Sequence, residues 1–171
     1  MSYTVIGIDP GIKGIGFGVV DAMTAETIQG GFVRRPVTGP QRGAELWHNL
    51  ALQVLSAVDK RNRVDVVAVE MQRSYPHSRT DPNDLIEIGM CGAWVAGILA
   101  THCAKGLCSV MNPLASTWKG QVPENIMAER IRGKLTEQEL SRIDFPNSKK
   151  FQQDVLHGIG LAKWVVLDGG Y

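Results

Sequence analysis

The stretch that decides the fold is Tyr3-Thr4-Val5-Ile6-Gly7-Ile8-Asp9-Pro10-Gly11. Its apolar run predicts a buried strand that ends on the carboxylate of Asp9 and turns at Pro10-Gly11. The chain then returns through a second apolar run, Gly14-Ile15-Gly16-Phe17-Gly18-Val19-Val20. A tight turn between two such runs predicts an antiparallel pair of strands. The sequence therefore places a carboxylate at the end of a buried strand.

The same pattern returns in a later run, Val64-Asp65-Val66-Val67-Ala68-Val69, which ends on Glu70. Two further strands are expected at about 27–33 and 107–111, and helical spacing predicts long helices at about 41–61, 82–105 and 148–167, with short helices within 113–143. This order of elements predicts an α/β fold with a mixed five-stranded sheet. Three antiparallel strands come first and two parallel strands follow, with helices on both faces.

Composition bounds the class of protein. A chain of 171 residues with 44% hydrophobic residues predicts one domain, residues 1–171, with a substantial core. The net charge of +1 means that any affinity for nucleic acid must come from local clusters of Lys and Arg. The longest uncharged apolar segment, Ile88 to Thr101, is shorter than the roughly 20 residues that span a bilayer. We expect no membrane association, and cytoplasmic reduced thiols at Cys91, Cys103 and Cys108.

Four residues form a candidate metal site. Asp154 and His157 lie three residues apart on the expected last helix, so both can face the sheet edge where Asp9 and Glu70 end their strands. Mg²⁺ and Mn²⁺ prefer carboxylate oxygens, and a pair of such ions can drive phosphodiester hydrolysis. Taken singly, an Asp before Pro-Gly is often only a turn, and a helical His is usually an ordinary core residue. The joint pattern favours a metal-dependent nuclease.

At this point a family resemblance enters. Ile6 to Gly11 with Gly14-Ile15-Gly16, then Val66 to Glu70, then Asp154 to Ala162, resemble the acidic segments of RuvC-type Holliday junction resolvases, in the same order. Pro113 to Gly120, which ends Trp118-Lys119-Gly120, resembles the segment that carries a catalytic lysine in phage-like members. The resemblance covers nearly the whole chain.

The resemblance implies an RNase H-like fold and a crossover junction endonuclease. Its catalytic residues would be Asp9, Glu70, Asp154, His157 and Lys119, and all of these except Lys119 would bind two Mg²⁺ or Mn²⁺ ions. It also implies a homodimer that nicks four-way DNA junctions symmetrically, with water as the nucleophile and no small-molecule cofactor. The protein would act in the cytoplasm of a bacterium or a phage-infected host.

The last helix departs from the family pattern. The family commonly ends this motif with Asp, three residues after an Asp or His, whereas here Asp154 precedes His157. His157 could therefore be a metal ligand or a general base that orients the water. Family members often carry a second lysine after the first, and here Glu124 and then Arg130 occupy that stretch.

DNA contacts are expected in the loop after Glu70. Arg73, His77 and Arg79 surround Tyr75, and basic residues around an aromatic ring suit a strand held by its phosphates with a base on the ring. The family probes the junction centre with an aromatic residue in this loop, which makes Tyr75 the candidate here. The predicted DNA-binding set is Arg73, Tyr75, Arg79, Lys119 and Arg130.

Other interpretations stay open at this level. The chain could be another RNase H-like nuclease that acts on RNA–DNA hybrids or flaps, or a junction-binding module without activity. An actin-like or sugar-kinase nucleotide-binding fold also starts with an Asp-Gly strand turn, but it usually needs two such domains. A row of small residues, Gly89, Ala93 and Gly97, predicts that another element packs closely on this helix. The sequence alone favours packing on the protein's own sheet, whereas the family resemblance implies a two-fold dimer in this region.

Overall fold

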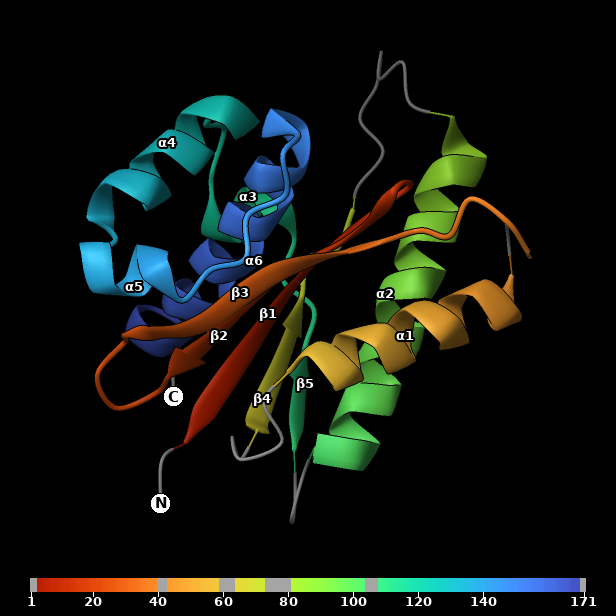
Figure 1. Cartoon of the computed structure of the whole chain (residues 1–171), viewed down its shortest axis with the longest axis horizontal. Helices are drawn as coiled ribbons and strands as arrows, with labels where there is room; N and C mark the ends of the chain where they lie inside the picture. Colours follow the sequence, from red (N-terminus) through yellow and green to blue (C-terminus); the bar gives the residue numbers. More distant parts are fainter. Residues whose placement is uncertain (1–2, 40–42, 59–63, 73–80, 104–107, 170–171) are drawn as a thin grey trace.

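A mixed sheet forms the centre of the protein, whose computed structural model describes residues 3–39, 43–58, 64–72, 81–103 and 108–169 (Figure 1). The sheet has five strands in the order β3-β2-β1-β4-β5. β1 pairs antiparallel with β2 and parallel with β4, β2 pairs antiparallel with β3, and β4 pairs parallel with β5. The predicted sheet is thereby confirmed. The strands are β1 (Thr4–Gly11), β2 (Gly14–Asp21), β3 (Thr27–Arg34), β4 (Val64–Val69) and β5 (Ser109–Met111).

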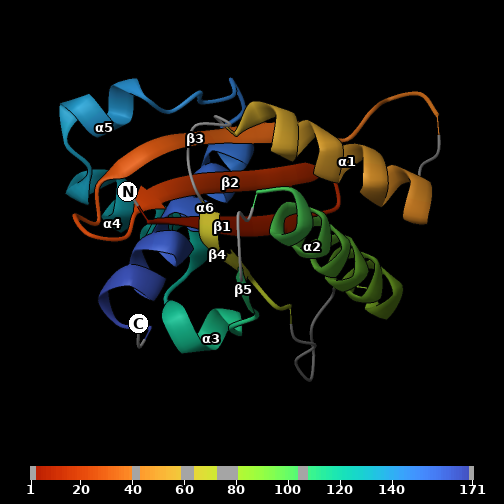
Figure 2. The same ribbon diagram turned by 90° about the horizontal axis from the view of Figure 1, so that it is seen from below.

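Helices cover both faces of the sheet, as predicted (Figures 1 and 2). On one side, α1 (Ala44–Ala57) and α2 (Pro82–Cys103) pack against each other and against the strands. On the other side, α6 (Lys149–Leu167) lies along β1 and β2 and carries α4 on its outer side. Three shorter helices connect β5 to α6, namely α3 (Ala115–Trp118), α4 (Glu124–Lys134) and α5 (Glu137–Ser141).

The first long helix is shorter than the predicted 41–61. It ends at Ala57 because Val58 has an extended backbone, with φ −71° and ψ 129°. The last helix agrees closely with the predicted 148–167, since Ser148 is its N-cap and Leu167 its last residue. The predicted ends of the second helix, at residue 105, and of the fifth strand, at residue 107, lie outside the described residues.

Strand periodicity directs both acidic side chains to the same face. Val5 packs in the hydrophobic cluster beneath α6, whereas Ile6 and Ile8 pack in the cluster beneath α1 and α2. Successive side chains of a strand point to opposite faces, so Asp9 follows Val5 onto the α6 side. In β4, Val66 and Ala68 belong to the α6 cluster. Glu70 continues this series, so it also faces α6.

Glycines let α6 approach the sheet closely. A side chain on Gly7 would run into the backbone of Gly158, and one on Gly16 would run into the backbone of Asp154. Gly18 is close to the backbone of Ile159 in the same way. Because Gly16 lies opposite Asp9 in the β1–β2 register, this close packing brings the first turns of α6 over Asp9. The glycines of the β1–β2 hairpin thus allow the first turns of α6, which carry Asp154, to lie close to Asp9.

The helix α2 has one face that nothing in the described chain covers. Gly92 and Ala96 are buried on its inner face, and a side chain on Gly92 would meet Val69 and Pro10. Its outer face exposes Ile86 (64%) and Met90 (49%), and at its margin Trp94 is 40% exposed while its ring lies 6.1 Å from that of Trp47 on α1. The segment Pro82–Thr101 is long and apolar enough to cross a membrane by length and composition, with a mean hydropathy of 1.4, a test that core helices of soluble proteins also pass. The prediction of no membrane association is not tested by this feature.

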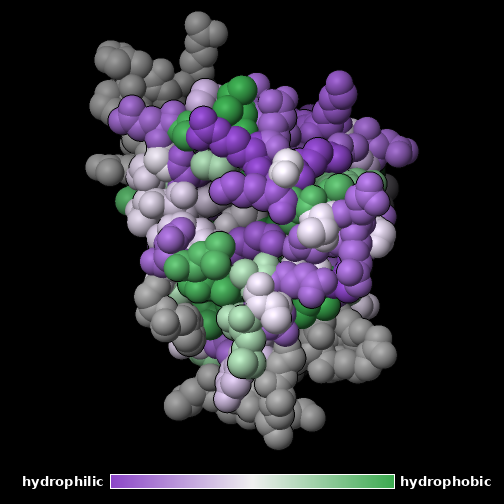
Figure 3. Space-filling model, turned by 90° about the vertical axis from the view of Figure 1, so that its left-hand side faces the viewer, coloured by the Kyte–Doolittle hydropathy of each residue, from purple (hydrophilic) through white to green (hydrophobic). Residues whose placement is uncertain are grey.

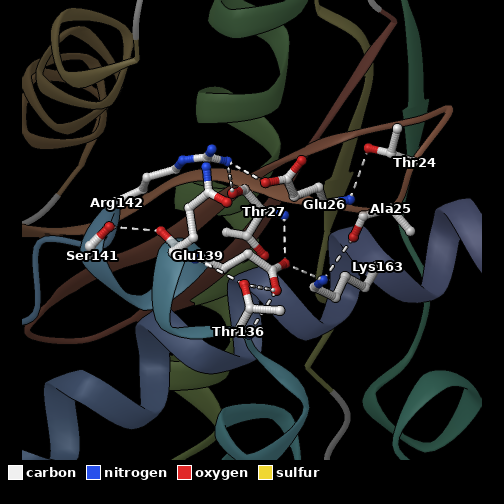
Figure 4. Close-up of polar contacts among 10 residues, drawn as sticks. Thr24, Ala25, Glu26, Thr27, Thr136, Glu139, Ser141, Arg142 and Lys163 are labelled. Carbon is white, nitrogen blue, oxygen red and sulfur yellow. Dashed lines mark hydrogen bonds and ion pairs between the residues drawn. The ribbon is translucent and has the colours of Figure 1, made fainter.

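A buried carboxylate joins α5 to the sheet and to α6 (Figure 4). Glu139 accepts hydrogen bonds from the ammonium of Lys163 at 2.7 Å and from the backbone N–H of Thr27 at 2.8 Å. Its other oxygen accepts from the N–H of Thr136 at 2.9 Å, which completes a capping box. The face of the molecule that carries α4 and α5 is largely hydrophilic, with separate hydrophobic patches (Figure 3).

The charge of Glu139 predicts a pH-dependent stability. Burial raises the pKa of Glu139, but the hydrogen bonds from Lys163, Thr136 and Thr27 outweigh it and lower that pKa from 4.5 to about 2. At about 1.4 kcal/mol per pKa unit, the ionised form contributes roughly 3 kcal/mol to folding. Because the folded pKa is depressed, this contribution is complete above pH 4.5 and is lost as the pH falls toward 2.

We expect Glu139→Gln to lower the free energy of unfolding by roughly 3 kcal/mol at pH 7, measured by urea denaturation. The difference from the original protein should shrink as the pH is lowered from 5 to 3. Glu137→Gln is the matched control, since Glu137 is an exposed carboxylate on the same helix. An equal loss in both variants, or a loss that does not depend on pH, would contradict the assignment.

Candidate active site

Asp9 and His157 form the buried centre of the site. Asp9 is 8% exposed and His157 is 3% exposed. The Nδ1 atom of His157 lies 3.2 Å from Oδ2 of Asp9, and its Nε2 atom lies 3.0 Å from the carbonyl oxygen of Glu124. The structure thus brings the N-terminal strand and the last helix together through this contact.

The protonation of His157 follows from its two partners. Both ring nitrogens face oxygen acceptors, and only an imidazolium donates from both. Burial lowers the pKa of His157, but the hydrogen bond and the negative charge of Asp9 outweigh it and raise that pKa above its ordinary value. In this arrangement neither nitrogen offers a lone pair. His157 would have to leave both partners to serve as a metal ligand or as a general base.

Glu70 is held by three donors. Oε2 accepts from the indole N–H of Trp118 at 2.9 Å. Oε1 accepts from the ammonium of Lys119 at 3.1 Å and from the side-chain amide of Gln72 at 3.2 Å. Glu70 is 3% exposed and Lys119 is 8% exposed, so this ion pair is nearly removed from solvent. A buried ammonium close to a carboxylate cluster is well placed to balance additional negative charge.

The backbone explains how residues 48 and 49 positions away reach Glu70. The N–H of Met71 donates to the carbonyl of Pro113 at 2.9 Å, and Met71 forms a parallel bridge with Leu114. The short helix α3 begins directly after this bridge, so Trp118 and Lys119 at its end come to lie beside the end of β4.

Asp154 adds a third carboxylate to the site. It is half-buried on the first turns of α6, one helical turn before His157. Burial and, after it, the negative charge of Asp9 raise the pKa of Asp154 to about 7. Burial and the charge of Asp9 also raise the pKa of Glu70, although Lys119 opposes them. The charge of Asp9 therefore repels both other carboxylates, which is the electrostatic setting that a bound cation relieves.

The donor chemistry suits Mg²⁺ or Mn²⁺, since Asp9, Glu70 and Asp154 all offer carboxylate oxygens. Within the part of the chain that the structure describes, no three Asp, Glu, His or Cys side chains converge closely enough to hold an ion as they stand. Glu70 is paired with Trp118 and Lys119 instead. The residues thus fit the ion in the chemistry of their donor atoms.

Solved structures resemble the fold of this chain, although no protein-family model and no curated protein sequence matches it. RuvC of Thermus thermophilus in complex with a Holliday junction substrate superposes with a TM-score of 0.66 at 22% identity, over 94% of this chain and 90% of that chain. The chain has the RuvC fold. A second T. thermophilus RuvC structure gives a TM-score of 0.59 at 21% identity, over 95% of each chain.

A eukaryotic protein also has a similar fold. The yeast mitochondrial Holliday junction resolvase Ydc2 gives a TM-score of 0.52 at 13% identity, over 94% of this chain and 79% of that chain. These similarities confirm the predicted RNase H-like fold class. At such identities they concern the fold, so the roles of individual residues depend on the geometry described above.

The predicted site residues divide into three groups. Asp9, Glu70, Asp154, His157 and Lys119 share one charged cluster, linked by the hydrogen bonds and pKa shifts given above. Arg130 lies on the exposed surface of α4, and no contact places it in that cluster. Arg73, Tyr75 and Arg79 lie outside the described residues, as does His77, so their DNA contacts stay predictions.

Sequence reasoning missed the role of Trp118. It was noted only as the neighbour of Lys119, yet its indole donates to Glu70 and its ring lies edge-on to His157, with centroids 6.1 Å apart. Trp118 also packs against both hydrophobic clusters on the α6 side. The only feature of the sequence that pointed to a role for Trp118 was its position in a polar segment, next to the expected catalytic lysine.

Trp118→Phe is expected to keep the ring packing and to remove the hydrogen bond to Glu70. Loss of such a supporting contact typically lowers metal affinity or activity 10- to 100-fold. We expect Mn²⁺ binding, measured by calorimetry, to weaken by about tenfold, with a small change in thermal stability. Trp94→Phe is the control, since Trp94 is a partly exposed tryptophan that packs on Trp47 of α1, on the other side of the sheet. Equal Mn²⁺ affinity in the two variants would contradict the role of Trp118.

Proposed function

We propose that this protein is a metal-dependent endonuclease that resolves four-way DNA junctions by paired symmetric nicks in the cytoplasm of a bacterium or a phage-infected host. One observation carries the proposal. The charge of Asp9 on β1 acts on two further carboxylates, Glu70 at the end of β4 and Asp154 on α6, and raises their pKa values together with burial, while the buried Lys119 pairs with Glu70. The RuvC fold, which is found in a protein solved with a Holliday junction, supports this substrate class.

The chain supplies most of the machinery for hydrolysis. Asp9, Glu70 and Asp154 would hold Mg²⁺ or Mn²⁺, which supplies an activated water and offsets charge on the leaving oxygen. Lys119 would leave Glu70 and pair with a phosphate oxygen near the scissile bond. His157 holds Asp9 in place and keeps a positive charge at the base of the site. Water is the nucleophile in this proposal, and no side chain forms a covalent intermediate.

A labelled synthetic four-way junction tests this function. Incubation with Mg²⁺ should give nicks at symmetric positions on two opposing strands, and none should appear with EDTA. Linear duplex, RNA–DNA hybrid and flap substrates of the same sequence should remain intact. Preferential cutting of the hybrid or the flap would replace the proposed function with another nuclease activity. Metal-independent binding without cutting would make the protein a junction-binding module.

We also propose that the protein acts as a homodimer through the outer face of α2. The exposed Ile86, Met90 and Trp94 lie four residues apart, on one side of the helix. A side chain on Gly89 or Gly97 would meet nothing within 4 Å, so a second backbone could approach there. A two-fold dimer would match a substrate with two symmetric strands to cut.

Met90→Glu is expected to convert the dimer to a monomer, because it places a charge in the centre of an apolar contact. Analytical ultracentrifugation checks the mass, and the junction assay should show single nicks in place of paired ones. Leu52→Glu, an exposed apolar position on α1, serves as the control. A monomeric original protein would contradict the dimer without affecting the assignment of the catalytic residues.

A further inference from the structure

A basic pocket lies beside the carboxylate site and has no role in the proposed chemistry. It occupies about 430 Å³ between the β1–β2 turn, the end of β3 and the first turn of α6. Lys13, Arg34, Arg35 and Phe151 line it, with Ile12, Pro36 and Val37. Its volume falls within the range of about 300–1,000 Å³ typical of ligand sites.

The pocket borders the active site through two elements. Phe151 lies three residues before Asp154 on α6, about one helical turn toward the N-terminus. Lys13 lies in the turn that follows Asp9 at the end of β1. A DNA strand whose phosphate reaches Asp9 and Asp154 would therefore place a neighbouring nucleotide over this pocket.

An aromatic ring and a guanidinium form one side of the pocket. Phe151 stacks on Phe32, with ring centroids 4.5 Å apart and planes 10° apart. The guanidinium carbon of Arg34 lies 6.0 Å from the centroid of the Phe151 ring. Phe151 is half-buried, so packing fixes its ring while part of it reaches the pocket. A rigid aromatic ring next to arginine is the usual platform for an unpaired base.

The charge of the pocket favours an anion. Three cationic side chains line it without any acidic one. Among the described residues, no ion pair joins Lys13, Arg34 or Arg35 to a carboxylate. The first turn of α6 also carries Lys149 and Lys150 and no acidic residue, although the positive end of a helix dipole disfavours lysine there. A phosphate bound at this point would neutralise the cationic side chains and would also interact favourably with the positive end of the helix dipole.

We infer that this pocket is a nucleotide subsite, in which Lys13 and Arg34 hold a backbone phosphate and Phe151 supports the adjacent base. The ligand is a DNA strand with an unstacked base, as occurs near the branch point of a junction. The inference rests on the proposed function, since it assigns the DNA strand next to the nick.

Junction binding in EDTA tests the subsite without cleavage. The probe is a fluorescein-labelled four-way junction, titrated at several salt concentrations. We expect the Lys13→Ala/Arg34→Ala double variant to bind about tenfold more weakly and its salt slope to fall by about two, one for each lost phosphate contact. Phe151→Leu should weaken binding about tenfold and leave the salt slope unchanged, because it removes the aromatic ring and no charge.

Two further measurements test whether the effect belongs to this pocket. Lys134→Ala removes an exposed lysine from the end of α4 and should leave affinity unchanged. Photocrosslinking with 5-iododeoxyuridine placed beside the mapped nick should label Phe151 in the folded original protein. Original affinity and salt slope in the double variant, or crosslinks found only elsewhere, would overturn the subsite.

The outcome for the subsite is distinguishable from the outcome for the nuclease. A protein that nicks junctions with Mg²⁺ while both pocket variants bind normally would keep the proposed function and lose the subsite. A protein that binds junctions through this pocket and never cuts them would keep the subsite and lose the proposed nuclease function.

Discussion

Asp9→Asn is expected to lose junction nicking by at least about a thousandfold while keeping junction binding. Asparagine preserves the size of the side chain and can still accept a hydrogen bond from His157. It removes the negative charge of Asp9, which acts on both Glu70 and Asp154. A metal ion stabilises the transition state by several kcal/mol, and about 4 kcal/mol corresponds to a thousandfold in rate. Single-turnover nicking with Mg²⁺ and binding of the junction in EDTA measure the two quantities.

Asp168→Asn is the matched control for this prediction. Asp168 is an exposed carboxylate at the C-terminal end of α6, at the other end of the helix from Asp154. Its replacement should leave nicking unchanged. Nicking by Asp9→Asn at the rate of the original protein would remove the basis of the proposed chemistry.

Gly16→Ala is expected to destabilise the protein by about 3 kcal/mol and to disturb the site as well. The added methyl group would run into the carbonyl group of Asp154 and would lie 2.6 Å from the backbone nitrogen of Val155. These are backbone atoms, so the first turns of α6 must move away from β2. Overpacking of this kind commonly costs about 1–3 kcal/mol. Urea denaturation measures the loss of stability.

The same substitution should lower nicking even where the variant is fully folded, since Asp154 moves with the helix. Nicking measured at 10 °C, well below its thermal midpoint, tests this effect. Gly133→Ala provides the control, because a side chain there meets nothing within 4 Å. It should be neutral or stabilising by up to about 1 kcal/mol, as expected for alanine in place of glycine in a helix. Equal stability of the two variants would contradict the close-packing argument.

The sequence predicted the elements whose signals are local. The limits of β2 followed from the apolar run between the turn at Pro10-Gly11 and Asp21. Glu70 stood out because a buried strand seldom ends on a carboxylate, and Asp9 stood out only in the joint pattern with the other acidic residues. The spacing of Asp154 and His157 predicted a shared helix face, and both do lie near Asp9.

Contacts between distant residues were beyond sequence reasoning. The hydrogen bond from Trp118 to Glu70 depends on the bridge between Met71 and Leu114, which no local pattern reveals. Helical spacing likewise placed His157 on a face without showing that both of its nitrogens meet acceptors. The buried pair of Glu139 and Lys163 resembles two surface residues in sequence. Tertiary packing alone decides such partnerships.

Asp9 and His157 touch although 148 positions separate them. During translation the residues of β1 are synthesised long before those of α6, so Asp9 has no partner on α6 until most of the chain has been made. The nascent polypeptide therefore cannot assemble its carboxylates and imidazole until synthesis has passed the last helix. In the proposed nuclease, the order of the elements along the chain would prevent an incomplete polypeptide from cutting DNA, with no inhibitor required.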